Sequence, residues 1–158
     1  MGAEPALDIE VIAGMAHNAT IDVYQTGDCG TANNACSTSL YGEYSQIVNA
    51  NVDRVVSISL GICEANPARA GVAAAEVGLF LQAAIQGQGV FASSGDTGAQ
   101  GCLGTNNLTG NAALCAENPA SQPFVTGVGV GASPPLFNTH PGTGPNSDRL
   151  GSRPGRPT

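Results

Sequence analysis

The sequence has no lysine and no tryptophan, and aromatic residues make up only 4% of its 158 positions. Five arginines stand against twelve acidic residues, so the formal net charge is −7. Because nucleic acids and anionic membrane surfaces attract basic patches, this charge argues against both as partners. The sequence also lacks any apolar run near the roughly 18 residues of a membrane helix. No basic, apolar signal segment follows Met1.

Small and apolar residues dominate what is present. Hydrophobic residues make up 42% of the sequence and glycine occurs 22 times, which favours a globular domain with helices packed closely on a sheet. The composition changes near residue 132, after which Pro, Gly, Ser and Arg replace the apolar pattern. We therefore predict one domain over residues 1–132 and a disordered tail over 133–158.

The five cysteines point to disulfides. No Cys-x-x-Cys pair occurs and there are only two histidines, so we expect no zinc or other metal site. Cys29 and Cys36 bracket a short polar loop and form a natural staple. Cys63, Cys102 and Cys115 then compete for one further bond, and the odd count leaves one thiol over.

Strand and helix signals alternate along the chain. We predict helices over 4–14, 40–51 and 70–86, and strands over 20–24, 54–61 and 90–92. Such alternation is typical of an α/β fold with a doubly wound parallel sheet and helices on both faces. In that fold the carboxyl ends of the strands carry the ligand crevice.

Acidic residues at two places in the sequence are candidate catalytic residues. Asp96 follows the predicted strand 90–92 between Gly95 and Gly98, where the backbone can approach a substrate closely. Glu4 and Asp8 share one face of the first predicted helix, with Cβ atoms about 5–6 Å apart. Two inward carboxylates at that spacing shift each other's pKa values. The alternatives are an ordinary Asx turn at Asp96 and a solvated acidic first turn of the helix.

Four motifs in order resemble the sedolisins, the serine-carboxyl peptidases of subtilisin-like fold. They are Glu4-Pro5-Ala6-Leu7-Asp8, Val56-Ser57-Ile58-Ser59-Leu60-Gly61-Ile62-Cys63-Glu64, Ser94-Gly95-Asp96-Thr97-Gly98, and Pro119-Ala120-Ser121-Gln122-Pro123-Phe124-Val125-Thr126-Gly127-Val128-Gly129. The resemblance covers about residues 4–131 and the central part of the family's catalytic domain. It implies an incomplete subtilisin-like fold and a serine-type endopeptidase acting on peptides or proteins at acidic pH.

The resemblance also implies roles for individual residues. Glu4 matches the general base for a serine nucleophile, Asp8 matches the residue that orients this base, and Asp96 matches the oxyanion hole. A carboxylate base works at a pH where histidine is protonated, and a protonated Asp96 can donate a hydrogen bond to the oxyanion. Likeness to subtilisins adds one segment that pairs with an extended substrate and one that walls the pocket for the residue before the scissile bond. These are Ser59, Leu60 and Gly61, and Ser93, Ser94 and Gly95 respectively.

The sequence departs from the family in two features. It contains no Gly-Thr-Ser nucleophile motif, since Gly142-Thr143-Gly144 ends in glycine, and it shows no counterpart of the family's calcium site. We therefore expect no cofactor in this chain and no turnover by the chain alone. The family implies an extracellular location. A disulfide found in some members favours Cys63 with Cys102 and leaves Cys115 free.

Two other functions stay open at this point. The run 127–131 alternates glycine and valine, as in a nucleotide-binding loop, but no predicted helix follows it to hold a phosphate. The second alternative is a non-catalytic protein that kept the peptide groove around residues 59–61 and lost the nucleophile. Binding of an extended peptide without cleavage would distinguish it.

Overall fold

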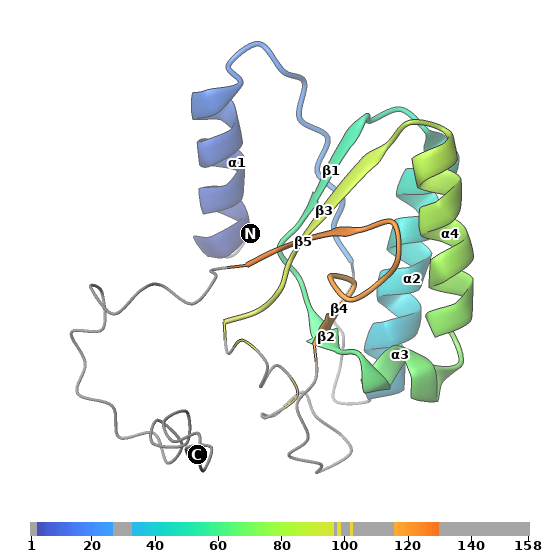
Figure 1. Ribbon diagram of the computed structural model, residues 1–158. Helices are drawn as coiled ribbons and strands as arrows, with labels where there is room; N and C mark the ends of the chain where they lie inside the picture. The colour runs from blue at the N-terminus through green and yellow to red at the C-terminus, as the bar shows by residue number, and fades with distance from the viewer. Residues whose placement is uncertain (1–2, 27–32, 97, 99–101, 103–115, 130–158) are drawn as a thin grey trace, which may run out of the picture.

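Three parallel strands form the centre of the fold (Figure 1). The structure is a computed structural model that describes residues 3–26, 33–96, 98, 102 and 116–129. The strands β1 (Val55–Ile58), β3 (Gly89–Ser93) and β5 (Thr126–Val128) lie in the order β1-β3-β5, so β3 is the middle strand. Both pairings are parallel, as the alternation in the sequence predicts.

Helices lie on both sides of this sheet (Figure 1). α2 (Asn33–Ala50) and α4 (Ala73–Ile85) cover one face, and α1 (Ala3–Met15) lies on the other side. The short helix α3 (Ala65–Ala70) packs mainly against α2. A second, two-stranded sheet pairs β2 (Ile62–Cys63) with β4 (Glu117–Asn118) in antiparallel orientation. The predicted α/β class is therefore confirmed.

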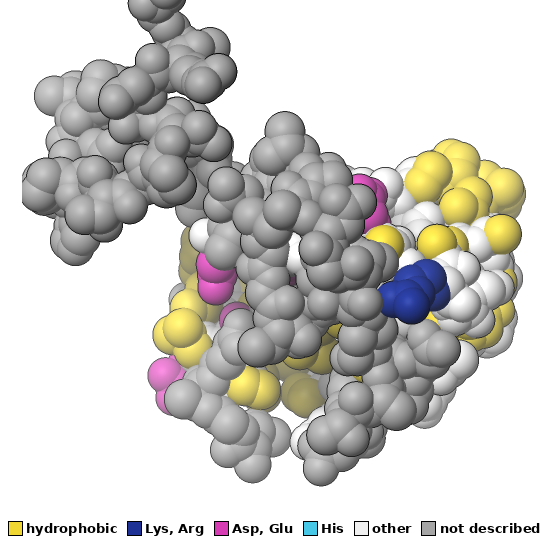
Figure 2. Space-filling view, turned by 90° about the horizontal axis from the view of Figure 1, so that it is seen from below, with side chains coloured by type: hydrophobic (Ala, Val, Ile, Leu, Met, Phe, Trp, Pro, Cys, Tyr) yellow, Lys and Arg dark blue, Asp and Glu magenta, His cyan; other side chains and the backbone are white. Residues whose placement is uncertain are grey.

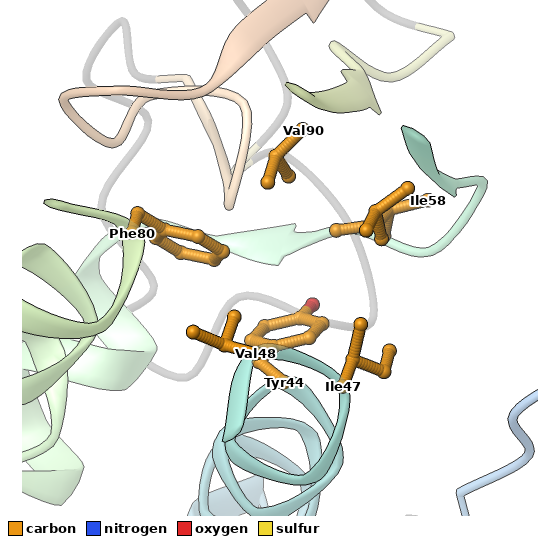
Figure 3. A pocket seen from close by; sticks show the side chains of 7 residues that line it. Tyr44, Ile47, Val48, Ile58, Phe80 and Val90 are labelled. Carbon is orange, nitrogen blue, oxygen red and sulfur yellow. The ribbon is translucent and has the colours of Figure 1, made fainter. Parts of the chain in front are cut away.

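The core lies between the sheet and the α2–α4 layer. The rings of Tyr44 from α2 and Phe80 from α4 meet with their centroids 5.6 Å apart, and both side chains are buried. Figure 3 shows them facing Ile58 and Val90 from the sheet around a small apolar gap. Because aromatic residues are scarce, this ring contact provides much of the bulk of the core.

In the described residues the strand β3 is buried on only one face. Val90 and Ala92 are buried, whereas Phe91 between them is 40% exposed, since successive side chains of a strand point to opposite faces. Val55 and Val128, on the neighbouring strands, are also exposed. The expectation that 90–92 is a strand covered on both faces is therefore wrong for the part of the chain described.

Several predicted element boundaries are also wrong. The predicted strand 20–24 pairs with no other described strand, and its Tyr24 instead donates a hydrogen bond to Asp53 at 3.3 Å. α2 begins at Asn33, so the polar loop before Cys36 is partly helical. Pro67 lies in the first turn of α3, within the stretch between the predicted strand 54–61 and the predicted helix 70–86. Proline is tolerated there because first-turn N–H groups have no partner within the helix.

A carboxyl group lies on the buried face of α4. The helical spacing predicts that Ala75 shares this face, but Ala75 is exposed and Glu76 is fully buried. Glu76 accepts a hydrogen bond from Gln122 at 2.8 Å, and Gln122 also donates to the side-chain oxygen of Asn118 at 2.9 Å. Burial raises the pKa of Glu76 to about 7, although the amides of Asn118 and Gln122 lower it in part.

We expect Glu76→Gln to remove a pH dependence of stability. The pKa of Glu76 is about 7 in the folded chain against an ordinary 4.5. The stabilising contribution of Glu76 to the free energy of unfolding is therefore fully present below pH 4.5, and it is lost as the pH rises toward 7. A shift of this size corresponds to on the order of 3 kcal/mol. The Tm measured across this pH interval should fall clearly less in Glu76→Gln than in the unchanged chain.

The exposed acid Glu10 of α1 provides the control for this experiment. Glu10→Gln removes the same charge without touching the core, so its Tm should fall with pH as it does in the unchanged chain. An equal fall of the Tm in Glu76→Gln would contradict the assignment of the pH dependence to the buried carboxyl.

Candidate active site

The carboxyl ends of β1 and β3 carry the two predicted substrate segments side by side. Ile58 lies opposite Ala92 in the parallel ladder, so residues 59–61 and 93–95 follow one pair of strands. Leu60 is 50% exposed, and among the described residues no backbone hydrogen bond involves 59–61. A backbone whose N–H and C=O groups are free at a sheet end can pair with an extended peptide.

The strand β5 is already hydrogen-bonded to Ser94 in the second predicted substrate segment, residues 93–95. The Ser94 backbone N–H donates to the Val128 carbonyl at 2.8 Å, and the Ser94 hydroxyl donates to the same oxygen at 3.1 Å. A Cβ placed on Gly129 would collide with the Ser94 hydroxyl. Ser94 is thus held against β5, and the segment can wall a pocket without offering the N–H of Ser94 to a ligand.

Asp96 lies at the exit of β3, where the sequence places it. The chain turns at Gly95, whose φ of 84° is in the left-handed region that favours glycine. Asp96 itself is exposed. An exposed carboxyl group at the end of a central parallel strand can reach a ligand in the crevice beside that strand.

The predicted acid pair lies on α1. Both Glu4 and Asp8 are within this helix, one turn apart, and Asp8 is partly buried. Glu4 lies outside the described side chains. In the view of Figure 1 the amino end of α1 is at the level where β3 and β5 end. The roles of Glu4 and Asp8 therefore remain predictions.

Glu117 is a site residue that the sequence analysis missed. It lies in β4 opposite Cys63 of β2, and a Cβ placed on either Gly61 or Gly95 would collide with its carboxylate. Partial burial raises its pKa, and the negative charge of Asp96 raises it further. Its one sequence signal is its position two residues before the motif that begins at Pro119.

A disulfide holds this end of the structure together. Cys63 of β2 is bonded to Cys102, which is the pairing that the family resemblance implies. Next to it, the Ala116 backbone N–H donates to the carboxylate of Glu64 at 3.2 Å. Cys36 is also disulfide-bonded, whereas Cys29 and Cys115 lie outside the described residues, as does the predicted tail.

The described residues contain no group of three or more His, Cys, Asp or Glu side chains that could hold a metal ion. Among the same residues, no helix is long and apolar enough to cross a membrane.

The fold and the strand-end site define an incomplete subtilisin-like α/β domain. The chain is 36% identical over 124 residues to sedolisin of Pseudomonas sp. (strain 101). It is 28% identical over 142 residues to xanthomonalisin of Xanthomonas sp. (strain T-22). These matches cover 78% and 80% of this chain, and 20% and 17% of the relatives. No family model matches the chain.

A solved structure agrees with these relatives. Pseudomonas sedolisin, a serine-carboxyl proteinase complexed with two molecules of pseudo-iodotyrostatin, matches with a TM-score of 0.60 and 33% identity. The match covers 77% of this chain and 32% of that one. The chain belongs to the sedolisin family, and it spans about a fifth of the length of the curated relatives it matches.

We expect Gly95→Ala to destabilise the chain more than Gly98→Ala. Both glycines have positive φ, 84° and 57°, so both substitutions carry the same kind of backbone penalty. Only the Cβ at Gly95 would displace the Glu117 carboxylate, since no atom of the described residues lies within 4 Å of the corresponding position at Gly98. The difference in the free energy of unfolding should be about 1 kcal/mol by denaturant titration. Equal losses would contradict the close approach of Glu117.

Proposed function

We propose that this chain supplies the central part of an acid-acting serine-carboxyl endopeptidase. The observation that carries the proposal is the adjacency of residues 59–61 and 93–96 at the ends of β1 and β3. In this proposal the first segment pairs with an extended peptide and places a peptide bond near Asp96. The family relationship supports the reaction class, because the relatives are sedolisins and one is a serine-carboxyl proteinase.

The proposed chemistry divides the work among three carboxyl groups. Glu4 takes the proton from a serine hydroxyl as its oxygen attacks the carbonyl carbon, and Asp8 orients Glu4. Asp96, in its neutral form, donates a hydrogen bond to the oxygen on which negative charge develops. Acidic pH suits this division, because a carboxylate base works at a pH where a histidine base is protonated. Residues 142–144 supply no serine, so the nucleophile is the part that this chain does not provide.

The proposal includes an extracellular location. The disulfides at Cys63–Cys102 and at Cys36 support it, because disulfides persist in oxidising compartments.

We expect the purified chain to show no peptidase turnover at acidic pH. The base and the oxyanion donor have nothing to activate without a serine nucleophile. Incubation with a mixture of peptides, followed by mass spectrometry, should detect no cleavage. Acid-dependent cleavage that disappears in Glu4→Gln would contradict this expectation, whereas cleavage that persists in Glu4→Gln would indicate a contaminating peptidase.

A peptide-binding protein without catalysis is the second candidate, favoured because the backbone at 59–61 makes no backbone hydrogen bond within the described part of the chain. Both candidates predict that an extended peptide binds by backbone pairing, which N-methylation of the paired amides blocks. In a fluorescence anisotropy titration, methylating alternate amides of one labelled peptide should weaken binding about tenfold in one of the two sets. The peptide methylated at the other amides, which point away from residues 59–61, should bind with the same affinity as the unmodified peptide. Equal binding of both sets would contradict the pairing.

A further inference from the structure

The carboxylate of Glu117 lies directly against both predicted substrate segments. Gly61 ends the first segment and Gly95 ends the second, and a Cβ on either would occupy the place of this carboxylate. Glycine at both positions therefore leaves the space that the carboxylate fills. The group that lies beside both segments is therefore a carboxyl group, although neither segment contributes an acidic or basic side chain of its own.

The position of Glu117 is fixed through its backbone. β4 pairs with β2, with Glu117 opposite Cys63, and the disulfide to Cys102 holds the same strand. The neighbouring Ala116 accepts a hydrogen bond from the Glu64 backbone N–H at 3.2 Å and donates one to the Glu64 carboxylate. Glu117 thus projects from a short sheet that is anchored on both strands.

No described basic side chain neutralises this carboxylate. Arg54 lies at the amino end of the main sheet, where it donates to Asn51 and to the Gln86 carbonyl, and Arg69 lies in the last turn of α3. Figure 2 views the molecule from below, and the acidic side chains visible there lie apart from the basic one. Asp96 adds a second negative charge, which raises the pKa of Glu117. Among the described residues, the Glu117 carboxyl group therefore has no basic side chain as a counter-ion.

We propose that Glu117 selects a basic residue, arginine or lysine, at the substrate position before the scissile bond. The inference rests on the proposed function, because that function makes Ser93, Ser94 and Gly95 the wall of this pocket. A guanidinium or ammonium group gains a charge-assisted hydrogen bond to the Glu117 carboxylate. An acidic side chain at the same position is repelled by the Glu117 carboxylate.

Arginine and citrulline provide the test, because they differ in charge and hardly in shape. Two labelled, N-acetylated peptide amides are used, which are identical except for arginine or citrulline at that position. Each peptide is titrated with the full chain at neutral pH and at low salt. We expect the arginine peptide to bind about tenfold more tightly. In Glu117→Gln the two affinities should agree within about twofold, since the amide keeps the shape and loses the charge.

Asp22→Asn is the matched control, because it removes one negative charge from an exposed residue far along the chain from the site. It should keep the full preference for arginine, whereas a general effect of net charge would reduce the preference in both variants. Equal binding of the two peptides to the unchanged chain would overturn the role of Glu117 and leave the peptide groove in place. Absence of binding by either peptide would overturn the proposed function together with this inference.

Discussion

The parallel ladder between β1 and β3 is the constraint on which the candidate site depends. These strands are separated in the sequence by α3 and α4, and only their pairing brings residues 59–61 beside 93–95. The ladder is held from one side by the packing of Tyr44 and Phe80 against the sheet. A change that weakens this packing therefore acts on the site without touching it.

The second constraint is the antiparallel pair β2–β4, which brings a distant acid to the same place. Glu117 reaches Gly61 and Gly95 because β4 is fixed to β2 by backbone pairing. The family motifs contain the two glycines but not the residue that fills the space between them. The carboxyl group beside these two glycines therefore comes from a residue that lies outside the motifs.

Glu76 shows that the spacing of apolar residues along a helix does not always predict which side chains are buried. A charged side chain is normally placed on the solvent side of a helix, and the spacing of apolar residues assigns Ala75 to the core instead. The structure buries Glu76 because Gln122, 46 residues away, donates a hydrogen bond to its carboxylate. Partners so distant in sequence leave no periodic signal, and the same holds for the segment 20–24, which has strand-like residues but no described pairing partner.

The sequence by itself determined the order of the main helices and strands, the parallel sheet, the position of Asp96 at a strand end and the relationship to the sedolisins. These follow from local patterns and from short motifs that survive in order. Only the tertiary structure decided which face of β3 is covered, that Glu76 is buried and that Glu117 lies between Gly61 and Gly95. Each of these depends on contacts between segments far apart in the chain, because burial and electrostatic environment belong to the packed molecule.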